Sequence, residues 1–86
     1  MPYIKPVDRN LFDREINVLA NKIQHEGDLN YCITRLCLLL CQKWGIKYKI
    51  YNLIIGVLEC AKLEIYRRHV AKYEDVKIKD NGDVIV

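Results

Sequence analysis

The sequence has few of the residues that interrupt regular secondary structure. Only 4 glycines and 2 prolines occur among 86 residues, and both prolines, Pro2 and Pro6, lie at the start of the chain. Hydrophobic residues make up 51% of the chain, which is typical of a folded protein and argues against disorder. A chain of this length has room for one domain with one small core, so we expect residues 1–86 to form a single domain.

The excess of positive over negative charge is also small, since the formal net charge is only +3. Nucleic-acid-binding domains usually carry a larger and more clustered excess of lysine and arginine. The composition therefore disfavours a nucleic-acid binder, although it permits a small anionic ligand.

Long apolar runs are missing as well. The longest, CITRLCLLLC at residues 32–41, contains Arg35 and is much shorter than the roughly 20 residues that span a bilayer. The N-terminal residues do not show the basic and apolar pattern of a signal peptide. We therefore expect a soluble cytoplasmic protein that makes no membrane contact.

Motifs for metal binding and catalysis are absent. The four cysteines, Cys32, Cys37, Cys41 and Cys60, form no CxxC pair and lie far in sequence from the two histidines, so we predict reduced, buried, structural thiols, no metal and no cofactor. No glycine-rich phosphate loop or nucleophile motif occurs, and Glu59 has no catalytic partner at a known spacing. We predict that the protein is not an enzyme. Glu59 is either a partly exposed carboxylate or a buried one that is bonded to Asn30, Tyr31 or an arginine.

Apolar periodicity predicts an extended segment at 1–7 and three helices at about 8–26, 28–44 and 49–73. Asp8 and Asp28 are expected to cap the first two helices, which Gly27 and Gly45 end.

The last residues, VKIKDNGDVIV at 76–86, change to a period of two. Asn81-Gly82 favours a type I′ turn that would place Ile78 opposite Ile85. The predicted fold class is therefore mainly α (α+β), a three-helix domain with a C-terminal β-hairpin.

The second and third predicted helices carry a second apolar stripe besides the one that faces the core. Its residues are Tyr31, Leu38 and Leu39 in the second helix and Ile55, Leu63, Tyr66 and Val70 in the third. A helix that is apolar on most of its circumference must be covered on more than one side, so we predict a homo-oligomer, in the simplest case a two-fold dimer. We interpret Gly56, which is unfavourable inside a helix, as a point of close backbone approach.

The segment EIYRRHVAKYED at 64–75 gathers cations near the end of the third predicted helix. One interpretation is a binding site for a phosphorylated small molecule, with Arg67, Arg68 and Lys72 as cations and Tyr66 and Tyr73 as ring faces. The alternative is ordinary surface ion pairing of the arginines with Glu64.

Four segments, MPYI, LNYCIT, NLIIGVLECAKLEIYRR and YEDVKIKDNGDVIV, resemble a family of small proteins of unknown function that occurs in bacteriophages and scattered prokaryotes. The resemblance implies a self-contained, phage-encoded protein that acts in the host cytoplasm, and it supplies no reaction. By analogy with phage proteins that counter host defences, the first hypothesis is a homo-oligomeric protein that sequesters a phosphorylated nucleotide-type signal. The second is a protein-interaction module or inhibitor that docks on a host protein through an apolar helix face.

Overall fold

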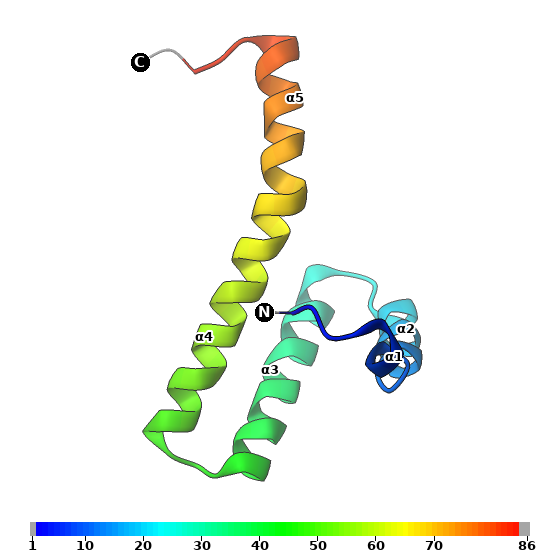
Figure 1. The fold of residues 1–86 in the computed structure, drawn as a ribbon, viewed down its shortest axis with the longest axis vertical. Helices are drawn as coiled ribbons and strands as arrows, with labels where there is room; N and C mark the ends of the chain where they lie inside the picture. Colours follow the sequence, from blue (N-terminus) through cyan, green and yellow to red (C-terminus); the bar gives the residue numbers. More distant parts are fainter. Residues whose placement is uncertain (1, 85–86) are drawn as a thin grey trace. The chain divides into compact units, whose positions relative to one another are not determined.

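Helices form all the regular secondary structure of residues 2–84, the part of the chain that this computed structural model describes (Figure 1). The elements are α1 (Pro6–Arg9), α2 (Asp13–Lys22), α3 (Glu26–Trp44), α4 (Tyr48–Ile65), the π-helical segment η1 (Tyr66–Val70) and α5 (Ala71–Asn81). The chain divides into two units, residues 1–54 and 55–86, which are described in turn. No helix among the described residues is both long enough and apolar enough to cross a membrane.

The single helix predicted at 8–26 is wrong, because the chain forms α1 and α2 with a turn between them. Pro6 opens α1 at the first helical position, where its missing N–H is no loss. After Arg9 the chain tightens, since the N–H of Leu11 donates to the Asp8 carbonyl at 3.2 Å and the N–H of Phe12 donates to the Arg9 carbonyl at 3.0 Å. These two bonds, each between residues three apart, end α1, and α2 starts at Asp13, one residue after Phe12.

The start of α3 also differs from the prediction, because Gly27 and Asp28 lie inside its first turn. The N-cap is His25. The Asp28 carboxylate accepts a hydrogen bond from the backbone N–H of Gln24 at 3.0 Å and lies 3.3 Å from His25 Nε2. It thus stabilises the helix start from the third helical position, by accepting from the residue before the N-cap, instead of from the cap itself.

The turn from α3 to α4 ends α3 at Trp44, as predicted. Gly45 has φ 113° and its N–H donates to the Cys41 carbonyl at 2.9 Å. Figure 1 shows that the chain reverses its direction at this turn, between α3 and the start of α4. Cys41 (2% exposed) and Ile54 (7% exposed) are the only buried hydrophobic residues in the described part of the chain, and both lie in the first unit.

The second unit is a single helical path, because α4, η1 and α5 follow one another without a break (Figure 1). The predicted hairpin is wrong, since Val76–Asn81 belong to α5 and no strand occurs among residues 2–84. Gly82 has φ 87° and its N–H donates to the Ile78 carbonyl at 2.8 Å. Asn-Gly therefore ends a helix here, a role that needs the same positive φ as a hairpin turn. Ile85, the expected partner of Ile78, lies outside the described residues.

The structure differs from two further predictions, a close backbone approach at Gly56 and the burial of all four cysteines. A Cβ atom added to Gly56 would meet no atom within 4 Å, so nothing in the described chain approaches it closely. The four thiols are free, as predicted, but only Cys41 is buried, and Cys60 is exposed.

Candidate functional site

The segment that the sequence analysis singled out coincides with an irregularity in the helix. Tyr66–Val70 form η1, in which the N–H of Ala71 donates to the carbonyl of Tyr66, five residues earlier. Such single π-turns are rare and are found frequently at functional sites. Arg67, Arg68 and His69 all lie in this turn.

The two arginines share one carboxylate. Arg67 Nη2 lies 2.7 Å from Glu64 Oε1, and Arg68 Nε lies 4.0 Å from the same oxygen. The Glu64 side chain is only 18% exposed, whereas both arginine side chains are at least half exposed. These are the ion pairs of the alternative interpretation. Surface ion pairs contribute about 0.2–1 kcal/mol to stability, and the arginine side of each of these pairs is exposed.

Lys72, Tyr66 and Tyr73, the other predicted ligand-binding residues, are exposed on η1 and the first turn of α5. The Tyr73 ring is in contact with Lys77, whose Nζ lies 5.5 Å from the ring centroid. This cation–π contact adds a lysine that the sequence analysis did not consider. The spacing of four residues between Tyr73 and Lys77 in a helix could have indicated it.

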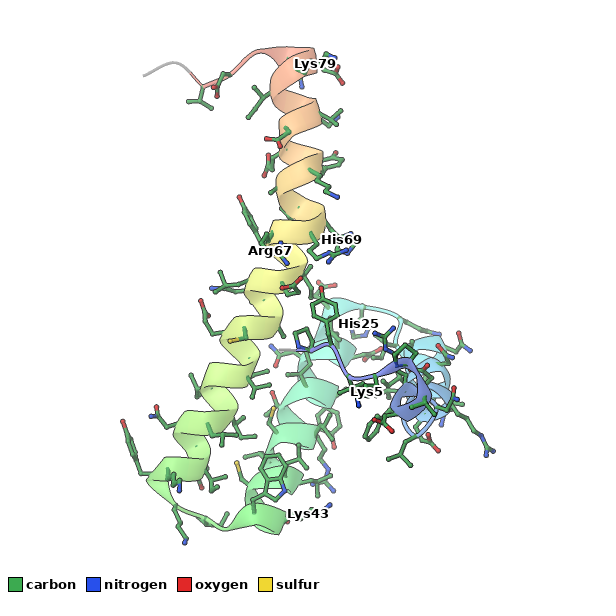
Figure 2. The ribbon with its side chains drawn as sticks, viewed as in Figure 1. Lys5, His25, Lys43, Arg67, His69 and Lys79 are labelled. Carbon is green, nitrogen blue, oxygen red and sulfur yellow. The ribbon has the colours of Figure 1, made fainter. Side chains whose placement is uncertain are left out.

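Figure 2 shows that the basic residues of η1 do not converge on one point, since Arg67 and His69 emerge on different sides of the helix. η1 is therefore an open turn with Arg67 and His69 on different sides of it. An open turn can attract a phosphate, but a second surface is needed to enclose the ligand.

Glu59, in contrast, is an ordinary surface residue. Its side chain is 54% exposed and pairs with Lys62 at 3.1 Å. Of the two interpretations in the sequence analysis, the partly exposed carboxylate is the one the structure shows. Asn30, one of the partners considered for a buried Glu59, instead accepts a hydrogen bond from the Thr34 hydroxyl through its Oδ1.

The predicted interface residues are almost all exposed in the single chain. Tyr31, Leu38, Leu39, Ile55, Leu63 and Tyr66 are exposed, and Val70 is half-buried. The structure brings Tyr66 and Val70 into η1, next to the basic residues.

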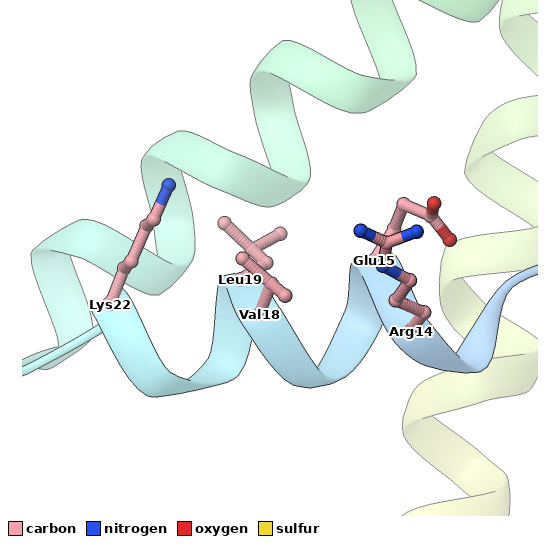
Figure 3. Close-up of a pocket in the computed structure, with 5 residues that line it drawn as sticks. All are labelled: Arg14, Glu15, Val18, Leu19 and Lys22. Atoms are coloured by element: carbon pink, nitrogen blue, oxygen red, sulfur yellow. The ribbon is translucent and has the colours of Figure 1, made fainter.

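The sequence analysis did not find a groove of about 450 Å³ along α2. It is lined by Arg14, Glu15, Val18, Leu19 and Lys22. Figure 3 shows the apolar side chains between Lys22 at one end and Arg14 and Glu15 at the other. All its lining residues come from one helix at spacings of three and four, so the groove is an uncovered helix face and not an enclosed pocket. No group of histidine, cysteine, aspartate or glutamate residues suited to a metal ion occurs in residues 2–84.

Comparison with protein families identifies the family of this chain. Residues 1–84 match the family described as Domain of unknown function (DUF6899). The chain belongs to the DUF6899 family. No curated protein and no solved structure matches it. The resemblance to a family of unknown function is confirmed, and the DUF6899 description assigns no role to η1 or to the α2 groove.

Proposed function

We propose that this DUF6899 protein is a non-enzymatic, homo-oligomeric binding protein, encoded by a bacteriophage and acting in the host cytoplasm. The observation that supports self-association is the lack of burial, since only Cys41 and Ile54 are buried hydrophobic residues in the described chain. A protein whose composition is 51% hydrophobic but which covers so few side chains needs a partner to stabilise it.

The proposed ligand is a phosphorylated small molecule of nucleotide type, bound at η1 and the start of α5. The support is the exposure of Arg67, Arg68 and Lys72 in and beside a π-turn, with Tyr66 and Tyr73 as exposed rings. Guanidinium groups bind phosphate by two parallel hydrogen bonds. A site that is open in one chain becomes enclosed if a second subunit covers it, which links the ligand to the assembly.

The test is a thermal-shift and calorimetry screen of the purified protein against cyclic dinucleotides, ADP-ribose derivatives and mononucleotides. A ligand that binds only the folded state raises stability by about 2.7 kcal/mol at a hundredfold excess over Kd. Arg67→Ala and Arg68→Ala should each weaken binding by about 1.5–3 kcal/mol, and Lys49→Ala, an exposed cation of α4, should not. Unchanged affinity in both arginine variants would contradict the ligand site, and the arginines would then serve only in the surface ion pairs with Glu64.

The second candidate is a protein-interaction module or inhibitor that docks on a host protein. The uncovered apolar face of α2, with Val18 and Leu19 in its groove, favours it. Co-purification of one stoichiometric host protein, together with no response to any nucleotide, would select this function over the first.

A further inference from the structure

Glu64 contacts the two arginines of η1 at unequal distances. Its Oε1 accepts a hydrogen bond from Arg67 Nη2 at 2.7 Å, whereas Arg68 Nε lies 4.0 Å from the same oxygen. The first distance is that of a short, charge-assisted hydrogen bond, and the second is too long for a hydrogen bond. All three residues belong to α4 and η1 of the second unit, so these distances are set within one continuous helical path.

The nitrogen through which Arg67 makes this contact is one that a phosphate also needs. A guanidinium group binds phosphate through two parallel N–H donors, either the end-on pair Nη1 and Nη2 or the side-on pair Nε and Nη2. Nη2 belongs to both pairs. A phosphate that takes either pair of Arg67 must therefore share Nη2 with Glu64 or displace the Glu64 carboxylate.

Sharing is unfavourable because both acceptors are negatively charged. Two oxygens that accept from the two hydrogens of one nitrogen lie only about 5 Å apart, since each N–O distance is about 2.8 Å. Like charges at this separation repel one another, and the repulsion weakens ligand binding. Displacement instead loses the hydrogen bond between Arg67 and Glu64. In both cases the carboxylate lowers the affinity of Arg67 for a phosphate.

A terminal phosphate is the ligand group best suited to overcome this competition. A free carboxylate offers Arg67 the same acceptor that Glu64 already provides, and it also loses translational freedom on binding. A terminal phosphate carries about −1.5 to −2 charge at pH 7 and has three strong acceptor oxygens. It therefore binds a guanidinium group more strongly than a carboxylate does.

We infer that Glu64 competes with the ligand for Arg67 and thereby sets the affinity of the η1 site, and that a terminal phosphate occupies the site by releasing Arg67 from Glu64. This inference deepens the proposed function and rests on its ligand site. It assigns Glu64 the opposite role to that of a residue that positions Arg67 for the ligand. The two roles predict opposite changes in affinity when the carboxylate is removed.

The experiment measures the affinity of the full chain and its variants for inorganic pyrophosphate, adenosine 5′-monophosphate and guanosine 5′-monophosphate by calorimetry. Glu64→Gln should lower the Kd about fivefold, the upper range of what one surface ion pair is worth. Glu59→Gln is the matched control, because it removes the same charge from α4 and breaks an ion pair of the same spacing, with Lys62 at 3.1 Å. It should leave the Kd unchanged.

A double-mutant cycle shows whether the gain depends on Arg67. In the Arg67→Ala background, Glu64→Gln should improve binding less than about twofold, because no hydrogen bond remains to be released. Glu64→Asp keeps the charge but shortens the side chain, so it should also bind more tightly than the parent, and it replaces Glu64→Gln if circular dichroism shows that this variant is unfolded.

Three outcomes decide the question. Weaker binding by the Glu64 variants would overturn the inference and make Glu64 a positioning residue. A gain no larger than that of Glu59→Gln, or one that persists in full without Arg67, would also overturn it. If neither the parent nor the Glu64 variants bind any of the three probes, the proposed ligand site itself is refuted.

Discussion

Two glycines of this chain have opposite effects on the helices that contain or precede them. Gly45 has φ 113°, which an L-residue rarely adopts, and it ends α3. Gly56 lies inside α4, where a Cβ would meet no atom within 4 Å. The positive φ at the end of α3 requires a glycine at position 45. Glycine at position 56 lowers the stability of α4, and no contact in the single chain offsets this loss.

Replacing both glycines by alanine should therefore change stability in opposite directions. Gly45→Ala should lower the free energy of unfolding by about 1–2 kcal/mol because of backbone strain. Gly56→Ala should raise it by about 1 kcal/mol, since alanine favours the helix. Denaturant unfolding at equal protein concentration measures both. A destabilising Gly56→Ala would indicate that another chain packs at this position.

The thiols give a second prediction at the level of single residues. Cys60 is exposed and Cys41 is buried, and all four cysteines are free. In the folded protein, Cys60 should react first with a thiol reagent and Cys41 last, because reaction requires access. After unfolding without reductant, four thiols should titrate per chain. A smaller number would contradict the absence of disulfides.

At the level of elements, α5 is where the sequence pattern and the structure disagree most. Alternating residues and Asn-Gly are typical of a hairpin, yet Ala71–Asn81 is helical because the helical path continues from η1. No sheet occurs among residues 2–84 on which an isolated hairpin could pack, and such hairpins are marginal in water.

Lys77→Pro tests the helix directly. Proline removes a hydrogen bond of α5 and clashes with the preceding turn, at a cost of about 3 kcal/mol or more. Helicity measured by circular dichroism should fall, whereas Lys77→Ala, which also loses the contact with Tyr73, should keep it. Cα chemical shifts of residues 76–80 that are typical of strands would contradict this assignment.

For the whole molecule, the described chain exposes its apolar residues in both units, from Tyr3 in the first to Val84 in the second. The parent protein should therefore have a mass above that of one chain at micromolar concentration in light scattering. Leu38→Asp and Leu63→Asp should give monomers or aggregates, because an aspartate at either position would be buried without a partner in the oligomer. Asn52→Asp, at an exposed polar position, is the matched control. A monomeric parent would contradict the prediction.

Local chemistry made several features predictable from the residues alone. The end of α3 at Trp44 follows from Gly45, and the free thiols follow from their spacing within helical patterns. The exposure of Arg67, Arg68 and Lys72 follows from their charge. The ion pairing of the two arginines with Glu64, in contrast, was only one of two alternatives. Each of these depends on interactions within about one helical turn.

Features that depend on the path of the backbone over several turns were not predictable in the same way. Asn81-Gly82 supplies a positive φ to either a hairpin or a helix end, and continuity with η1 decides for the helix. The sequence from Ile65 to Val70 continues the predicted third helix, and only the hydrogen bond from Ala71 to Tyr66 shows the π-turn there. The residue types limit which local backbone conformations are possible. The hydrogen bonds between successive helical turns select one of these conformations, and a single π-turn changes the direction of every side chain that follows it in the helix.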